Sequence, residues 1–553
     1  MFVSLDRLGL FHATCVATFA LVSLLPVRAG AQPAEGIPVT DPLVVSKCGT
    51  CHPADDRGRL ERISWARATP EGWQEVLRRK LGDNGVSVTP VEARAIVKYL
   101  STRHGLAPEE SKPVMYYAER RVHDELGRVD ESVLTACATC HEAGRALAWR
   151  RPAEEWKRFV DAHSARYKFE PEPEVVERLA TVAPFATPEW TAWSARAQAP
   201  HLAGRWLVTA RARGRGAFCG EMDIEATGTA DEYLTRVRLR GVSDATPLER
   251  SGRTVVYAGT AWRGRSSGAG GASLSGEDLA SEAREAMWVA SDATTIEGRW
   301  FWGQYQELGL DVTLRRASTM PTLLLVEPSA LKAGTRAGRV RLIGDGFPAP
   351  AAAADLEFGA GVTLRRVVSS TPNEIVVEVD VASDARSGTR DVAVRSSRLE
   401  NVVAIFDRVD YVQVTPESSL ATFGDRMFPL GVQQFDAIGY QRGPDGRSHT
   451  ADDLELGPIP VTWSMDVFYE VDQRVRDRVG TVNQRGFFTP AGLNPGANYD
   501  VWIVATTKTE KNVDGKPLVG KGYLVVTVPT YTFNGRTFVR ELDRWVEDRS
   551  GTR

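Results

Sequence analysis

The stretch SKCGTCHP, residues 46–53, decides how the first third of the chain folds. It places Cys48 and Cys51 with two residues between them and puts His52 directly after the second cysteine. Two thiols at this spacing can attach to the vinyl groups of a haem, and the adjacent imidazole binds the iron. The stretch therefore predicts a c-type haem with His52 as its proximal ligand.

The same arrangement returns as TACATCHE, residues 135–142. Here Cys137 and Cys140 are the attachment cysteines, and His141 is the proximal ligand. A zinc site or a redox-active cysteine pair is the alternative, but the histidine that follows each pair favours haem. We predict two c-type haems. Cys219 belongs to neither motif and has no neighbouring base, so we expect an unreactive thiol.

Length and charge limit the possible functions. A chain of 553 residues is too long for one hydrophobic core, and domains of about 100–200 residues suggest roughly three to five of them. The formal net charge is only −3. Because nucleic-acid binding depends on an excess of basic groups, we predict no nucleic-acid partner.

Residues 1–31 have the pattern of a secretory signal peptide. Arg7 precedes an apolar stretch at 8–26, and Ala29-Gly30-Ala31 is a small-x-small cleavage sequence. An uncleaved anchor is the alternative, but the apolar stretch is short for a membrane span. We predict export to the periplasm and no membrane span after cleavage.

Helical patterns fill residues 32–198. The stretches TPEGWQEVLRRKL and TPVEARAIVKYLSTRHGL each begin with a threonine suited to cap a helix, Thr69 and Thr89, followed by proline in the first turn. Apolar residues then recur at helical spacing. The sequence predicts a helical dihaem cytochrome c domain here.

The period changes after residue 198. Short alternating runs separated by Gly, Ser and Asp are typical of antiparallel strands. We predict an antiparallel β-barrel at 199–318, an Ig-like β-sandwich at 319–412 and a C-terminal β-sandwich at 413–553. The expected fold class is therefore multidomain, α followed by all-β. The tryptophans of the β-region are expected to be core or interface anchors.

Four stretches carry a resemblance to a known family: GRLERISWARATPEGW, RRPAEEWKRFVDAH, FDAIGYQRGPDGRSHTADDLELG and VGTVNQRGFFTPAGLNPG. In them the chain resembles the α subunit of quinohaemoprotein amine dehydrogenase, over essentially its whole mature length. The resemblance implies a dihaem electron-transfer subunit. It also implies two partners, a propeller subunit and a small subunit whose tryptophylquinone oxidises the amine. Electrons would leave to a soluble cytochrome c or cupredoxin.

His163 is the predicted distal ligand of the second haem. The stretch AEEWKRFVDAH places Trp156, Phe159, Val160 and His163 on one helical face. A histidine at the end of such a stripe, downstream of a haem motif, is well placed to reach the iron. The matching position in the family supports the same role.

The distal ligand of the first haem stays open. Superposing the two halves on Trp73 and Trp156 puts Lys80 opposite His163, at a place where the family commonly has methionine. A vacant site is also possible, and it would admit small molecules. The remaining candidate ligands are Met115, His104 and His123.

The loop at 445–453 could hold calcium through Asp445, Asp452 and Asp453. Its spacing does not match an EF-hand loop, so we expect a polar turn instead.

Two other functions are compatible with the sequence. The first is a peroxidase-like enzyme with an open haem, and the second is an electron-transfer or binding subunit of another periplasmic dehydrogenase. The β-region shows no nucleophile with a base, no paired carboxylates and no phosphate-binding glycine loop. We therefore predict no catalytic residue in this chain.

Overall fold

The structure is a computed structural model that describes residues 35–83, 85–114, 133, 137, 143–195, 201–268, 279, 281–302, 308–424, 430–468, 478–492 and 496–528. The predicted signal peptide, residues 1–31, lies outside them. The chain begins with a helical haem-binding region and continues with several all-β domains, which confirms the predicted fold class. Within the described residues, none of the helices combines the length and apolar character needed to cross a bilayer.

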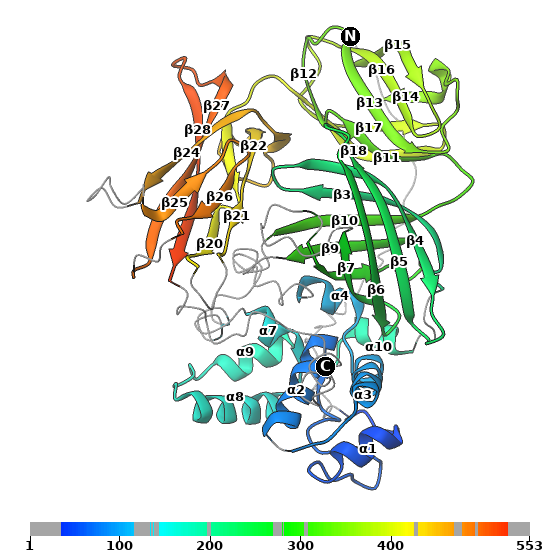
Figure 1. The fold of residues 1–553 in the computed structure, drawn as a ribbon, viewed down its shortest axis with the longest axis vertical. Coiled ribbons are helices and arrows are strands. Elements are labelled where there is room, and N and C mark those ends of the chain that lie inside the picture. Colours follow the sequence, from blue (N-terminus) through cyan, green and yellow to red (C-terminus); the bar gives the residue numbers. More distant parts are fainter. Residues whose placement is uncertain are drawn as a thin grey trace, which may run out of the picture. The chain divides into compact units, whose positions relative to one another are not determined.

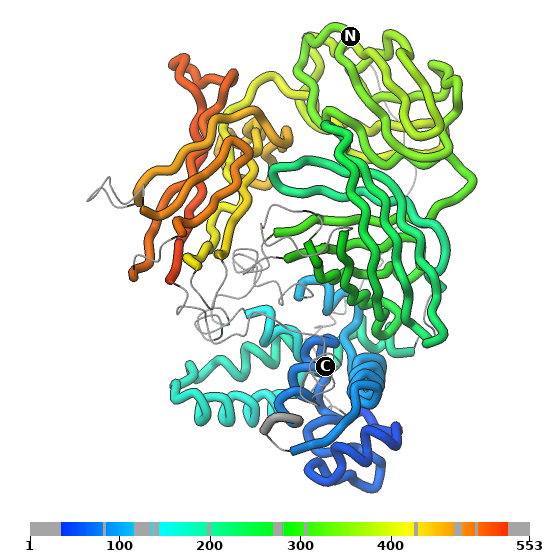
Figure 2. Tube along the Cα trace, in the orientation of Figure 1, coloured from blue at the N-terminus to red at the C-terminus, as the bar shows by residue number. Residues whose placement is uncertain are grey.

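The helical region starts its helices where the sequence predicts. Thr89 and Glu92 form a capping box at the start of α3, with hydrogen bonds of 3.2 and 2.7 Å between side chain and amide. Thr69 accepts from the Gly72 amide at the start of α2. Figure 2 traces the path of the chain. The elements are α1 Pro42–Cys48, β1 Arg67–Ala68, α2 Pro70–Asp83, α3 Pro90–Arg103, α4 Pro108–Ser111, η1 Lys112–Val114, α7 Gly144–Leu147, β2 Trp149–Arg150, α8 Ala153–Tyr167, α9 Val175–Val182 and α10 Pro188–Ser194.

Two structural repeats make up this region, each with a short strand and two helices. The strands β1 and β2 pair antiparallel, with Arg67 opposite Arg150. The buried indole of Trp73 on α2 donates to the carbonyl that follows α3, that of His104, at 3.0 Å. The buried indole of Trp156 on α8 likewise donates to the carbonyl that follows α9, at 3.1 Å. The superposition of Trp73 on Trp156 made from the sequence is therefore confirmed in space.

The second domain is a closed, eight-stranded antiparallel barrel in which each strand pairs with the next and the last with the first (Figure 1). Its strands alternate buried and more exposed residues, as the period of two requires. Trp206, Trp262 and Trp300 fill the interior, which confirms that these are core anchors. The strands are β3 Gly204–Ala212, β4 Gly216–Ala226, β5 Glu232–Gly241, β6 Pro247–Tyr257, β7 Ala261–Gly268, β8 Ala283–Val289, β9 Thr295–Trp302 and β10 Leu308–Arg316.

The third domain is a sandwich of two four-stranded sheets, β11-β13-β16-β15 and β12-β18-β17-β14. Buried valine, leucine and isoleucine side chains from both sheets form its core. The strands are β11 Thr322–Glu327, β12 Ala330–Lys332, β13 Gly338–Asp345, β14 Leu356–Phe358, β15 Val362–Ser370, β16 Glu374–Val381, β17 Gly388–Val394 and β18 Ser397–Phe406.

The last domain consists of three sheets, β19-β22-β23, β20-β28-β27-β24 and β21-β26-β25, around a separate core. Its first strand, β19, begins at Tyr411, just before the predicted domain start at 413. The strands are β19 Tyr411–Thr415, β20 Ser418–Thr422, β21 Gln433–Gln434, β22 Asp436–Gln441, β23 Leu454–Pro458, β24 Val461–Val467, β25 Gly480–Val482, β26 Phe487–Pro490, β27 Tyr499–Lys511 and β28 Pro517–Thr527.

Candidate haem-binding sites

The first motif closes the last turn of α1. Asp41 caps this helix by accepting a hydrogen bond of 2.9 Å from the Val44 amide. The amides of Cys51 and His52 then donate to the Cys48 carbonyl at 3.1 and 2.9 Å. These bonds fold the motif back on the helix end, so both thiols and the imidazole extend from one turn.

The side chains of this turn have different surroundings. Cys51 is exposed, whereas Cys48 is half-buried against the apolar cluster of α1, α2 and α3. Nδ1 of His52 is buried and has no hydrogen-bond partner among the described residues. Burial lowers the pKa of His52, which favours the neutral imidazole that iron binds. A half-buried imidazole and two thiols at attachment spacing, all extending from one turn, fit a covalently bound haem.

Lys80 lies on the same side of the helical region as this motif. It is half-buried near the end of α2. After burial, its positive charge is the next cause of the lowered pKa of His52. Burial also raises the pKa of the Cys48 thiol, and Lys80 opposes that rise. The Val86 amide donates to the Lys80 carbonyl at 3.3 Å, and the Lys47 ammonium donates to the carbonyl of the next residue, Ser87, at 2.9 Å. The end of α2 that carries Lys80 and the end of α1 that carries the motif therefore meet at the same loop.

His104, another candidate ligand, is buried at the end of α3. Its ring contacts Trp73 and Tyr99, with ring centroids 6.1 and 6.4 Å apart. Burial lowers the pKa of His104 to about 4, although the nearby Ala66 backbone favours the charged form. The ring is therefore neutral at ordinary pH. The candidates Met115 and His123 lie outside the described residues.

The second motif is described only at Cys137, since Cys140 and His141 lie outside the described residues. Burial raises the pKa of the Cys137 thiol to about 11. This side chain packs on a cluster that contains Trp156 and Phe159 from α8. The structure therefore places one attachment cysteine against the helix that carries the predicted distal ligand.

That predicted ligand, His163, is in the last turns of α8. Its ring stacks on Phe159 with the centroids 5.3 Å apart, and it also contacts Tyr167 and Phe169. Phe159 is the side chain that links His163 to the cluster around Cys137. The aromatic surroundings suit the face of a porphyrin as well as they suit an imidazole.

Trp149 connects the two candidate sites. This side chain, on β2, packs against the cluster that includes Cys48 and also against the cluster that includes Cys137. Its ring meets Trp73 edge to face, with centroids 5.2 Å apart. The two motifs are thus joined through a continuous set of packed side chains.

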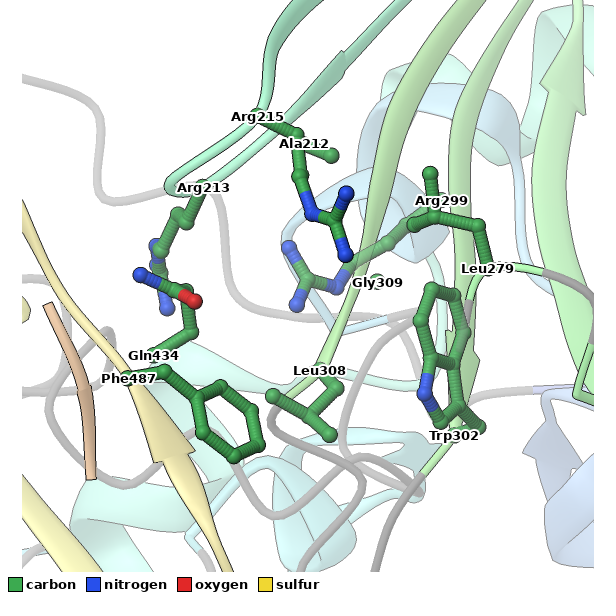
Figure 3. A pocket seen from close by; sticks show the side chains of 10 residues that line it. All are labelled: Ala212, Arg213, Arg215, Leu279, Arg299, Trp302, Leu308, Gly309, Gln434 and Phe487. Carbon is green, nitrogen blue, oxygen red and sulfur yellow. The ribbon is translucent and has the colours of Figure 1, made fainter. Parts of the chain in front are cut away.

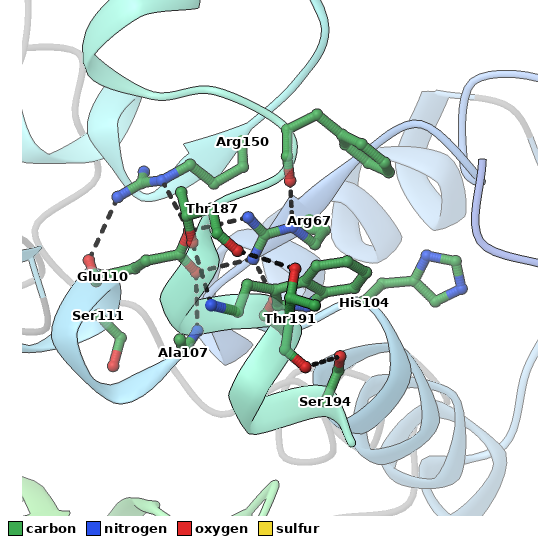
Figure 4. A network of polar contacts seen from close by, with 12 residues as sticks. Arg67, His104, Ala107, Glu110, Ser111, Arg150, Thr187, Thr191 and Ser194 are labelled. Carbon is green, nitrogen blue, oxygen red and sulfur yellow. Dashed lines mark hydrogen bonds and ion pairs between the residues drawn. The ribbon is translucent and has the colours of Figure 1, made fainter. Parts of the chain in front are cut away.

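A buried ion-pair network that the sequence did not reveal supports this junction (Figure 4). Arg67 donates to both Glu110 carboxylate oxygens at 2.7 and 2.8 Å, and to the Phe185 carbonyl. Thr187 and the Ala107 amide also donate to Glu110, at 3.0 and 2.8 Å. An arginine inside the stretch SWARA signals a buried charge, but its partner is 43 residues away in sequence. Sequence periodicity could not identify that partner.

One pocket lies where the barrel rim meets the last domain (Figure 3). Arg213, Arg215 and Arg299 extend into it from the barrel, and Gln434 and Phe487 close it from the other domain. None of the predicted haem-site residues lines this pocket. It is therefore separate from the candidate sites.

The acidic loop at 445–453 is a turn stabilised by its own hydrogen bonds. Asp453 accepts from the Tyr411 hydroxyl at 2.7 Å and from the amides of Gly443 and Thr450 at 3.0 Å. Asp445 accepts from the Arg447 amide. Within the described part of the chain, no group of three or more histidine, cysteine or acidic side chains is arranged to hold a metal ion. The geometry favours the polar turn.

Cys219 lies half-buried on β4. Burial raises the pKa of its thiol to about 12, which agrees with the expectation of an unreactive group.

Four family models match the chain in sequence order. Residues 39–176 match the haem-binding domain of the quinohaemoprotein amine dehydrogenase α subunit. Residues 199–317, 320–407 and 412–536 match domains II, III and IV of the same subunit. Together these matches cover nearly all of the described chain.

Several solved structures match parts of the chain. A redesigned β-barrel matches at 14% identity with a TM-score of 0.17, covering 21% of this chain and 92% of its own. A crystal structure of human protocadherin-24 EC1-2 matches at 13% identity with a TM-score of 0.15, covering 38% of this chain and 98% of its own. No curated protein matches the sequence.

Proposed function

Because this chain belongs to the family of quinohaemoprotein amine dehydrogenase α subunits, we propose that it is the dihaem electron-transfer subunit of a periplasmic amine dehydrogenase. Its family makes it a haem-binding subunit of an oxidoreductase complex. The proposal adds two c-type haems, a quinone-bearing partner and export from the cytoplasm.

The packing of Trp149 is the observation that most supports electron transfer. A protein that passes electrons between two haems needs both of them in one rigid body. Trp149 contacts the clusters around Cys48 and Cys137 together, and the β1–β2 pair fixes its backbone. The junction is therefore suited to hold two irons at a constant separation.

We assign a distinct role to each residue of the two CxxCH motifs and to His163. The four cysteines Cys48, Cys51, Cys137 and Cys140 attach the haems, and His52 and His141 bind the irons. His163 completes the coordination of the second iron. Haem iron, once bound, alternates between the ferric and ferrous states and so carries one electron at a time. The burial of Cys48 and Cys137 keeps one edge of each site in apolar surroundings, which influences the potential.

We assign amine oxidation to partner chains. A propeller subunit and a small tryptophylquinone subunit would supply the substrate site, and a soluble cytochrome c or cupredoxin would accept the electrons. The all-β domains would then provide surfaces for assembly.

Haem content is the first test. The exported full-length protein is expected to keep two haems per chain after denaturation in acidified organic solvent, because thioether bonds survive that treatment. Changing both Cys137 and Cys140 to alanine should leave one haem, whereas Cys219→Ala should leave two. Loss of all haem from the wild-type protein on denaturation would contradict covalent attachment.

Electron flow is the second test. Amine added to a complex with the quinone-bearing subunit is expected to reduce both haems, as seen in the Soret and α bands. The isolated α chain should stay oxidised under the same conditions. Reduction of the isolated chain by amine would move the oxidation site into this subunit and contradict the proposal. Sequencing the mature N-terminus checks export, with Gln32 expected as the first residue.

A further inference from the structure

We propose that the Lys80 amine is the sixth ligand of the iron bound by His52. This inference rests on the proposed function, because it presupposes a haem at the first motif. It selects Lys80 from the four candidate ligands. The argument depends on where the helices of the first repeat place their ends.

The first observation is the face of α2 on which Lys80 lies. Trp73 and Leu77 are 3% and 6% exposed, and Lys80 follows them at the spacing of one helical stripe. The second repeat has the same stripe on α8, where Trp156 and Val160 are buried and His163 follows. Lys80 therefore occupies the position in its repeat that the predicted distal ligand occupies in the other.

The second observation is the direction of α1 relative to α3. The Lys47 ammonium donates to the Ser87 carbonyl at 2.9 Å and pairs with Glu92 at 3.2 Å. At the other end of α1, the Thr40 amide donates to the Tyr99 hydroxyl at 2.8 Å. The helices are therefore antiparallel, and the motif that follows Lys47 lies beside the start of α3.

Lys80 is at this same end of the repeat. Its carbonyl accepts a hydrogen bond of 3.3 Å from the Val86 amide, the residue next to Ser87. The loop between α2 and α3 thus contacts Lys47 on one side and Lys80 on the other.

His104 lies at the end of α3 that is far from the first motif. It lies 12 residues beyond Glu92, and a helix rises 1.5 Å per residue, so about 18 Å separates the two along α3. Its ring is enclosed by Trp73 and Tyr99, and its carbonyl receives the Trp73 indole. We assign His104 to packing between the helices.

The Lys80 side chain has no competing role in the described structure. Among the described side chains, no carboxylate forms an ion pair with its ammonium, unlike Lys47 and Lys157, which pair with Glu92 and Asp161. Ligation requires the free amine. The Lys80 ammonium would give its proton to solvent, and its lone pair would then bind the iron in place of a water molecule. No electron is transferred in this step.

The test is near-infrared magnetic circular dichroism of the oxidised holoprotein, together with electron paramagnetic resonance. The wild-type first haem is expected to be low-spin with a charge-transfer band typical of histidine–amine ligation. The difference spectrum between the wild type and Lys80→Ala isolates this haem. In Lys80→Ala the band should disappear, a high-spin signal should replace it, and added cyanide should bind one haem per chain.

Two further variants sharpen the result. Lys80→Met should create a thioether-to-iron band and raise the midpoint potential of one haem, because a thioether favours the ferrous state. Lys157→Ala, which removes an exposed lysine from α8, should change neither spectrum nor potential. If Lys80→Ala does not accumulate, the wild-type band and the Lys80→Met spectrum decide the assignment.

Several outcomes would overturn the inference. A thioether band in the wild type would assign the ligand to a methionine such as Met115, and a bis-histidine band for both haems would assign it to a histidine. A high-spin first haem in the wild type would show an open site and support the peroxidase-like alternative. Haem content separates the two failures. Two covalent haems per chain with a different sixth ligand would overturn only this inference, whereas loss of covalent haem would overturn the proposed function.

Discussion

At the scale of single residues, Arg67 and Glu110 form a buried ion pair at the centre of the helical region. Arg67 is completely buried, and its guanidinium also lies over the Trp190 ring at 4.6 Å. The pair links β1 to α4, and through Thr187 to the start of α10. Its charges are compensated only while both partners are present.

We predict that Glu110→Gln lowers the free energy of unfolding by about 3–5 kcal/mol, because it leaves the Arg67 charge buried without a counter-ion. Urea unfolding followed by the Soret band measures this loss. Asp161→Asn is the control, since Asp161 is 59% exposed in its pair with Lys157 and should change stability by less than about 1 kcal/mol. Equal effects of the two changes would contradict the importance of burial.

Asp453 gives a pH-dependent prediction. Burial raises its pKa, but hydrogen bonds from Tyr411, Thr450 and Gly443 outweigh that effect and hold it at about 2, below its usual value of 3.8. The folded state therefore binds this proton less tightly than the unfolded state, so the carboxylate stabilises the fold above pH 4 and that contribution is lost as the pH falls towards 2.

The corresponding measurement compares wild type and Asp453→Asn in urea at several pH values. We expect the wild type to be more stable at pH 6 and the difference to vanish as the pH approaches 2. A difference that stays constant over this range would show that the Asp453 charge does not stabilise the turn.

At the scale of elements, Gly72 allows α2 to approach β1 and β2 closely. A Cβ at this position would lie 2.9 Å from the Ala68 Cβ and 3.2 Å from the Trp149 ring. Distances this short force a shift of the neighbouring elements. Gly72 therefore helps determine how tightly the two repeats pack.

We predict that Gly72→Ala destabilises the protein by about 1–2 kcal/mol, because overpacking of about 1–3 kcal/mol exceeds the helix propensity gained from alanine. Near-ultraviolet circular dichroism should also change, since Trp149 moves. Gly228→Ala is the control, because a Cβ there meets nothing within 4 Å. Stabilisation by Gly72→Ala would contradict the close approach.

The sequence predicted individual helices and strands better than it predicted which of them lie next to each other. Thr89-Pro90 identified the start of α3, and alternation identified strands such as β7, because both signals are local. The pairing of β10 with β3 closes the barrel and joins segments about a hundred residues apart. No local sequence pattern predicts such a pairing. The ligand candidates show the same limit. The motif and the His163 stripe were visible, but the choice between Lys80 and His104 required the direction of α1 relative to α3.

At the scale of the whole molecule, the helical region is tied to the barrel by a buried ion pair. Glu71 on α2 accepts from Arg263 on β7, with Nη2 and Oε2 3.2 Å apart, and the side chains are 4% and 9% exposed. Glu71 belongs to the helix that carries Trp73 and Lys80. The pair therefore links the barrel to the helix that carries the candidate ligand Lys80.

We predict that Arg263→Ala shifts the Soret unfolding transition to lower urea by the equivalent of about 3–5 kcal/mol, although Arg263 lies outside the haem-binding region. Adding Glu71→Ala should recover part of the loss, because the double variant buries no unpaired charge. Urea unfolding of the four proteins in this cycle measures the coupling. Strictly additive effects would show that the pair does not link the domains.

The β1–β2 pair has a consequence for the origin of the chain. Arg67 pairs with Arg150, which is its own counterpart in the second repeat. When a residue pairs with its own counterpart across two antiparallel strands, a local two-fold axis passes between them, as in a symmetric homodimer. The two repeats of the helical region are therefore related like the two halves of a symmetric dimer. Duplication and fusion of an ancestral gene would produce this arrangement directly, and it would let the two copies differ at the equivalent position, which is Lys80 in one repeat and His163 in the other.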